Sequence, residues 1–235
     1  WLVLSITFGF GAIGFIDDYF KLTSINNKGL KAGTKLIFQF LISSITIFFL
    51  YNLFEYQFIN TLAVPFFKNF LLDLGVFFPI FAFVVIIGTS NGVNLTDGLD
   101  GLAVVPVITT ATCLGLIAYL VGNKIFSDYL NLFFVAGAGE LSILSASLVG
   151  SCLGFLWYNA HPAKIFMGDT GSLSIGAALG SISIIIKHEI VLFIIGFLFV
   201  LETMSVILQV TSFKLFKKRL FLMSPLHHHF EKKGW

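Results

Sequence analysis

The stretch FVVIIGTSNGVNLTDGLDGLAVVP, residues 83–106, joins two strongly apolar runs through a short polar segment that carries two asparagines and two aspartates. Apolar runs of this kind cross lipid bilayers, where an ionised carboxylate is costly. Asn94, Asp97 and Asp100 recur every three residues, so a helical turn would place them on one face. The stretch predicts a polar site where two membrane spans meet the membrane surface; a solvated turn between the spans is the alternative.

The composition of the whole chain points the same way. Of its 235 residues, 57% are hydrophobic and only 11% are charged, whereas a soluble domain carries about 25% charged residues. The net charge of +2 is too small to indicate a nucleic-acid partner. Cys113 and Cys152 lie inside apolar runs and are interpreted as small core residues. The sequence therefore predicts an integral membrane protein, all-α and polytopic, in a single transmembrane domain over residues 1–235.

Hydropathy predicts seven spans, with boundaries uncertain by a few residues. They cover about 1–16, 35–54, 77–91, 102–121, 138–158, 172–186 and 190–212. The chain begins within an apolar run, without a Met, and stops abruptly at EKKGW, so we interpret it as a piece of a longer protein. Strict alternation of seven spans places four segments on one side of the membrane: 17–34, 92–101, 159–171 and 213–235.

Basic residues support this division. Eleven of the fourteen lysines and arginines lie in or beside those four segments, and Lys68, Lys124 and Lys187 lie in the opposite ones. Cytoplasmic loops of membrane proteins carry the excess of positive charge. The four segments are therefore predicted to be cytoplasmic, and they also hold the grouped aspartates and histidines.

The motif GFIDDYFK, residues 14–21, places Asp17 and Asp18 at the predicted carboxyl end of a span. Carboxylates are unfavourable near the negative end of a helix dipole, so the pair needs a reason. One reason is a hard cation or a shared proton. The other is a frayed, solvated helix end beside Lys21.

The motif HPAKIFMGDTGSL, residues 161–173, offers Asp169 or Thr170 as the cap of the next span. The free N–H groups of that helix would form an anion site. The motif SPLHHHFEKKGW, residues 224–235, carries three adjacent histidines beside two lysines, which suits phosphate or sugar hydroxyls. A capping aspartate and a basic loop held at lipid head groups are the alternatives for these two motifs.

The chain resembles members of the polyprenyl-phosphate N-acetylhexosamine-1-phosphate transferase superfamily. The resemblance lies in four motifs, in this order and between these spans: GFIDDYFK, NGVNLTDGLDGLA, FMGDTGSL and PLHHHFEKKGW. The histidine motif resembles its phospho-N-acetylmuramoyl-pentapeptide transferase family. The resemblance covers nearly the whole chain and implies about ten spans in the full-length protein. This chain would lack the first two spans and the last one, and also an early cytoplasmic loop.

The resemblance also implies an activity and its partners. It implies transfer of phospho-N-acetylmuramoyl-pentapeptide from UDP-MurNAc-pentapeptide to undecaprenyl phosphate, giving lipid I and UMP with Mg²⁺ as cofactor, at the cytoplasmic face of a bacterial inner membrane. Membrane lipid is a further expected partner, and a homodimer is left open as the assembly.

By family pattern, Asp169 is expected to ligate Mg²⁺, with Asp17 and Asp18 beside it and Asp17 as the candidate base. The other implied substrate-binding residues are Lys21, Asn94, Asp97, Asp100, Phe166, Gln209, His227, His228 and His229.

Two alternatives remain. The first is a related transferase acting on another UDP sugar, such as UDP-N-acetylglucosamine. The second is a membrane transporter, which would place ionisable residues along a pathway at the middle of the membrane. Only Glu140 and Glu202 are acidic residues within predicted spans, and the grouped aspartates lie at span ends, which disfavours a transporter.

Overall fold

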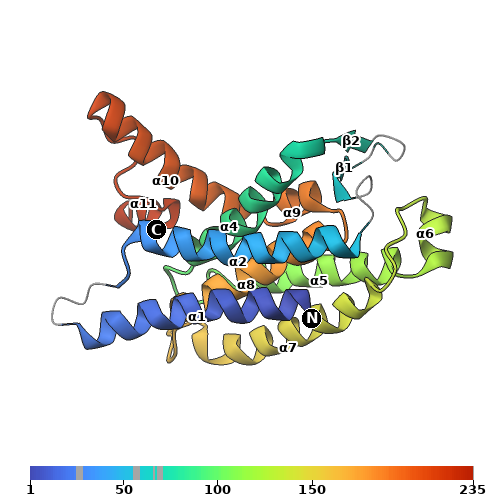
Figure 1. Ribbon diagram of the computed structural model, residues 1–235. Coiled ribbons are helices and arrows are strands. Elements are labelled where there is room, and N and C mark those ends of the chain that lie inside the picture. Colours follow the sequence, from blue (N-terminus) through green and yellow to red (C-terminus); the bar gives the residue numbers. More distant parts are fainter. Residues whose placement is uncertain (25–28, 55–58, 66, 68–70, 235) are drawn as a thin grey trace.

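The computed structural model describes residues 1–24, 29–54, 59–65, 67 and 71–234, and in them the chain is a bundle of long helices (Figure 1). Lys28, Lys68 and Trp235, which the topology and the histidine motif included, lie outside the described residues. The elements, in chain order, are α1 (Leu2–Thr23), α2 (Ala32–Leu53), β1 (Thr61–Ala63), β2 (Leu71–Asp73), η1 (Gly75–Phe77), α4 (Phe78–Thr96), α5 (Val104–Val121), α6 (Lys124–Leu130), α7 (Gly139–Asn159), α8 (Gly168–Ile185), α9 (Glu189–Ile195), α10 (Phe197–Phe216) and α11 (Leu226–Lys232).

Within the described residues, six helices are long and apolar enough to cross a membrane: α1, α2, η1 with α4, α5, α7 and α10. Their outer faces carry large exposed apolar side chains such as Phe8, Phe48 and Trp157. Apolar surface on that scale is stable in lipid and not in water. The all-α, multi-pass membrane fold predicted from the sequence is confirmed.

The sixth predicted span, 172–186, forms α8, which is not among these six helices; it lies at the centre of the bundle and packs against α1 and α4. This helix is rich in Gly and Ser, so its backbone approaches its neighbours closely. A Cβ on Gly176 would lie 2.5 Å from the Cα of Ser90 on α4. Close approach through small residues is the usual way that membrane helices pack.

Several predicted boundaries were wrong. The single span expected over 190–212 is two helices, α9 and α10, which meet at Gly196. Helix α1 continues through Thr23 and α4 through Thr96, so residues 17–23 and 92–96 are helical, not loop. As a result, Asp17, Asp18 and Asn94 sit on helices, which hold their side chains in fixed directions.

The two ends of the bundle differ in character (Figure 1). One end carries the carboxyl ends of α1, α4 and α10, the short helix α11, and the start of α8. The other carries α6 and the β1–β2 hairpin, in which Thr61 pairs with Asp73 in an antiparallel register. The grouped acidic and histidine motifs all lie at the first end.

Candidate active site

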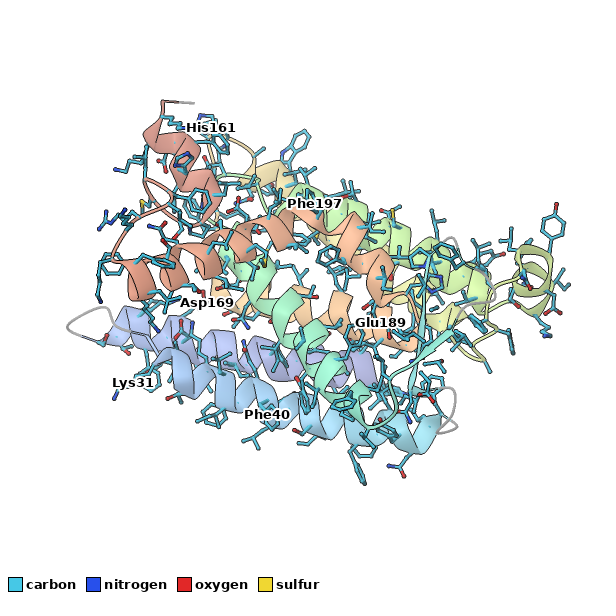
Figure 2. All side chains as sticks on the ribbon, turned by 90° about the horizontal axis from the view of Figure 1, so that it is seen from above. Lys31, Phe40, His161, Asp169, Glu189 and Phe197 are labelled. Atoms are coloured by element: carbon cyan, nitrogen blue, oxygen red, sulfur yellow. The ribbon has the colours of Figure 1, made fainter. Side chains whose placement is uncertain are left out.

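Three carboxylates meet where α1 ends and α8 begins. One oxygen from each of Asp17, Asp18 and Asp169 lies within 4.8 Å of the others. Asp17 and Asp18 come from the last two turns of α1, and Asp169 from the first turn of α8. Figure 2 shows Asp169 toward the same end of the bundle as Lys31 and His161, with Glu189 farther along.

Asp17 is completely buried and is held by three donors. Its Oδ1 accepts the backbone N–H of Leu30 at 2.6 Å. Its Oδ2 faces the ammonium groups of Lys21, at 2.7 Å, and Lys35, at 2.9 Å. A buried carboxylate needs such partners, because an unpaired one is strongly destabilising. Asp17 is therefore anchored as a charged group between two lysines.

Asp18 points to the amino end of α8, and its Oδ1 also lies 3.4 Å from the Lys21 ammonium. Its Oδ2 accepts the backbone N–H of Thr170 at 3.0 Å and the Thr170 hydroxyl at 2.9 Å, and its Oδ1 accepts the N–H of Asp169 at 3.3 Å. These are N–H groups that a helix leaves unsatisfied at its start. Gly168, with φ of +65°, has no side chain to block Asp18. Asp18 thus caps a helix from a different segment of the chain.

Asp169 lies between the lysines and the end of α4. Its Oδ2 is 2.5 Å from the Lys35 ammonium and 3.1 Å from that of Lys21. Its Oδ1 accepts the amide of Asn94 at 2.9 Å, and the same amide donates to the Ser172 hydroxyl at 2.8 Å. The structure therefore brings together five predicted site residues: Asp17, Asp18, Lys21, Asn94 and Asp169.

The turn after α4 forms a second part of the site. Burial, followed by the nearby charge of Asp169, raises the pKa of Asp97 from its ordinary value to about 6. Asp100 accepts the backbone N–H of Ala163 at 3.0 Å and contacts the ring of His161 at 3.0 Å, and these bonds lower its pKa. Asp100 therefore ties this turn to the segment before α8.

The three histidines have three different surroundings. His227 is buried, and its backbone N–H donates to Glu202 on α10. His228 contacts Glu231 through Nδ1 at 2.8 Å. His229 accepts the backbone N–H of Leu222 through Nδ1 at 3.1 Å, which places its proton on Nε2 when the ring is neutral.

Gln209 and Phe166 lie apart from the carboxylates. The Gln209 amide oxygen accepts the backbone N–H groups of Leu220 and Phe221, at 3.0 and 2.9 Å, so this side chain holds the segment after α10. Phe166 is 76% exposed in the segment before α8, where its ring is open to an approaching group.

Sequence reasoning missed four residues that build the site. Lys35 entered only the charge count, although it links Asp17 to Asp169. Glu202 was noted only as an acidic residue within a predicted span, and Thr170 was considered only as a possible cap. Asn159 was not considered; its amide accepts the Gly101 N–H and donates to the Ile165 carbonyl. An acidic residue inside a predicted span, as at Glu202, was the available signal in the sequence.

The donor set at the junction fits a hard divalent cation. All three side chains offer oxygen, which Mg²⁺ and Ca²⁺ prefer, and all three already face ammonium groups that a cation would replace. The same lysines suit phosphate oxygens once displaced. The arrangement can therefore hold a divalent cation and offer two ammonium groups to phosphate oxygens.

Comparison with known proteins gives consistent matches. A family model described as glycosyl transferase family 4 matches residues 1–187. A phospho-N-acetylmuramoyl-pentapeptide-transferase of Pelagibacter ubique (strain HTCC1062) is 55% identical over 235 residues, and one of Rhodopseudomonas palustris (strain BisA53) is 53% identical over the same length. The whole chain is covered in both cases, and it spans 65% of the length of each relative.

Proposed function

The chain belongs to glycosyl transferase family 4, and from this we propose that the whole protein transfers phospho-N-acetylmuramoyl-pentapeptide from UDP-MurNAc-pentapeptide to undecaprenyl phosphate. Lipid I and UMP are the products. The observation that carries the proposal is the junction of Asp17, Asp18 and Asp169 with Lys21 and Lys35, at one end of a membrane bundle. Such a junction suits a reaction in which two anionic phosphates must approach each other.

The proposed reaction forms one bond and breaks one. An oxygen of the lipid phosphate attacks the phosphorus that carries the sugar, and the bond from that phosphorus to the UMP oxygen breaks, with its electron pair leaving on UMP. A phosphate monoester is largely ionised near neutral pH, so only a residual proton has to be removed. Asp17 is the candidate base, and it becomes free to accept that proton when Lys21 and Lys35 turn from it to the phosphates.

The other residues have positioning and binding roles in this proposal. Asp18 holds the start of α8, and thereby the backbone of Asp169, in place. Asn94 orients the Asp169 carboxylate. The uridine end of the nucleotide substrate is proposed to bind at Asp97, Asp100 and Phe166. Its sugar and peptide end is proposed to bind at Gln209 and at the histidine segment, residues 224–234.

The proposed cofactor is Mg²⁺, held by Asp169 with Asp17 and Asp18 beside it. When bound, Mg²⁺ would neutralise phosphate charge and stabilise the transition state. The three convergent carboxylates are the feature of this chain that fits it.

The proposed location is a bacterial inner membrane, with the site on the cytoplasmic side. The catalytic segments are proposed to be 17–34, 92–101, 159–171 and 213–235 of a single domain covering residues 1–235. The excess of basic residues at this end of the bundle supports that orientation.

The test uses the full-length protein in detergent or vesicles. With undecaprenyl phosphate and Mg²⁺, it should release UMP from UDP-MurNAc-pentapeptide and form a lipid-linked product. UDP-N-acetylglucosamine in place of the muramoyl substrate should give little or no UMP. Release of UMP from UDP-N-acetylglucosamine alone would assign the chain to the related transferase instead.

A further inference from the structure

Glu202 is a buried acid in the second turn of α10, and its partner is His227 in the segment after α10. Its side chain is 3% exposed. The backbone N–H of His227 donates to Oε1 at 3.2 Å and lies 3.4 Å from Oε2, and the Nδ1 atom of the His227 ring is 3.3 Å from Oε2. The carboxylate therefore accepts a hydrogen bond from the backbone of His227 and lies against the ring of the same residue.

The other edge of the same ring rests on the turn after α4. A Cβ built on Gly98 would collide with Nε2 of His227, and it would also lie only 2.9 Å from Cε1. Gly98 has no side chain, so the ring can sit directly against the turn backbone. The His227 ring thus fills the space between α10 and the turn that carries Asp97 and Asp100.

We infer that Glu202 is a positioning residue: it fixes the His227 ring against Gly98 and so holds the turn carrying Asp97 and Asp100 in place. This inference rests on the proposed function, which assigns that turn to the uridine end of the substrate. Glu202 acts through His227 and does not touch the reacting phosphates.

The arrangement around Glu202 favours a positioning role over a role in the chemical step. The carboxylate lies inside the bundle, and His227 covers it. Neither ring nitrogen of His227 makes a well-directed hydrogen bond within the described residues, and both are buried. A buried ring without such bonds is held by packing and by its charged neighbour, so its position depends on both Glu202 and Gly98.

The stretch that joins α10 to the histidine segment has separate attachments to α10. The Gln209 side chain binds Leu220 and Phe221, and the Ser212 hydroxyl donates to the Lys218 carbonyl at 2.9 Å. These bonds do not involve Glu202. Loss of Glu202 should therefore displace the His227 ring without releasing the whole segment.

The kinetic test compares Glu202→Gln and Glu202→Ala in the full-length protein, each substrate being varied in turn. Glu202→Ala should raise KM for the uridine nucleotide roughly 10- to 100-fold, with kcat and the KM for the lipid phosphate within a few-fold of wild type. Glu202→Gln keeps an acceptor for the His227 N–H, so its KM for the nucleotide should lie between those of wild type and Glu202→Ala. Glu140→Gln, an exposed acid at the other end of the bundle, is the matched control and should not change either constant.

A second test needs no activity. Gly98→Ala should lower the thermal unfolding temperature of the solubilised full-length protein by a few degrees, because its new methyl group meets His227. In a His227→Ala background the same change should cost little, since the obstacle is gone. The two substitutions should therefore be strongly non-additive.

Three outcomes would overturn the positioning role of Glu202. They are additive effects of Gly98→Ala and His227→Ala, an unchanged nucleotide KM in Glu202→Ala, or a fall in kcat alone in Glu202→Ala. If Glu202→Ala does not fold, Glu202→Gln and the Gly98–His227 pair carry the test. The unfolding temperatures of the Gly98 and His227 variants could be non-additive in a protein that releases no UMP. That result would refute the proposed function and leave the positioning role intact.

Discussion

Asp17 and Asp18 are neighbours in the sequence and both contact Lys21, yet their other partners differ. Successive residues of a helix point about 100° apart, so Asp17 faces the two lysines and Asp18 faces the start of α8. The sequence drew attention to the pair, because carboxylates at a helix carboxyl end are unfavourable, but it left a solvated helix end as an alternative. It gave no means to see that one of them caps a helix that starts about 150 residues later.

The cap predicts a difference between two substitutions of Asp18. Asparagine keeps an oxygen that can accept the N–H and hydroxyl of Thr170, whereas alanine keeps none. Asp18→Ala should lower the free energy of unfolding by roughly 0.5–2 kcal/mol, and Asp18→Asn by clearly less. Thermal unfolding of the solubilised protein measures both. Equal destabilisation by the two variants would contradict the cap.

Asp97 predicts a pH dependence of stability in the absence of metal. Its pKa is raised from 3.8 to about 6 in the folded protein, so folding favours the neutral carboxyl group. The unfolded chain releases this proton first as pH rises, and stability is therefore lost between about pH 4 and pH 6. With a chelator present, Asp97→Asn should be more stable than wild type at pH 7 and similar to it near pH 4. A constant difference between the two proteins at all pH values would show that Asp97 does not titrate in this way.

At the scale of elements, α8 determines where the site residues lie. Its first turn carries Asp169, and it packs against α1 and α4, which bring Asp17, Asp18 and Asn94. The motif GDTG has a physical reason at three positions: Gly168 leaves room for Asp18, Asp169 meets the lysines, and Thr170 donates to Asp18. Hydropathy located this helix, but the close approach of its backbone to α1 was not visible in the sequence.

Gly14 tests that close approach. A Cβ on Gly14 would lie 2.6 Å from the Cα of Thr170 and would also collide with the Asp169 carbonyl group. Gly14→Ala should therefore force α1 from α8, with a loss of unfolding free energy of about 1–3 kcal/mol and a loss of turnover. Gly154→Ala is the matched control, because nothing lies within 4 Å of a Cβ there, and it should be neutral or slightly stabilising. Similar behaviour of the two variants would show that the α1–α8 contact is not as close as described.

At the scale of the whole molecule, the sequence predicted the class of fold and the end of the bundle that carries the site. Long apolar runs and the excess of basic residues were sufficient, because both reflect the lipid and not the tertiary contacts. Helix ends were predicted less well: the break at Gly196 and the extension of α1 and α4 depend on packing. For the same reason Lys35 and Glu202 were not assigned to the site, since their contacts are with partners distant in the sequence.

The orientation can be tested by labelling single cysteines in intact cells. Lys217→Cys lies at the carboxyl end of α10, near the site, and Lys124→Cys at the start of α6, at the opposite end of the bundle. A membrane-impermeant thiol reagent should label position 124 from outside, and position 217 only after the membrane is opened. Labelling of position 217 in intact cells would contradict both the topology and the cytoplasmic location of the site.

The most direct test of the carboxylate junction is the turnover of the full-length Asp169→Asn variant, measured as UMP release from UDP-MurNAc-pentapeptide with undecaprenyl phosphate at saturating Mg²⁺. This substitution keeps the size of the side chain and removes the charge that faces Lys35. Turnover should fall by several orders of magnitude, because a positioned metal supplies several kcal/mol of transition-state stabilisation. Asp128→Asn, an exposed carboxylate paired with Lys124 on α6, is the control and should keep wild-type turnover. Near-normal turnover of Asp169→Asn would contradict the central claim that this junction carries the reaction.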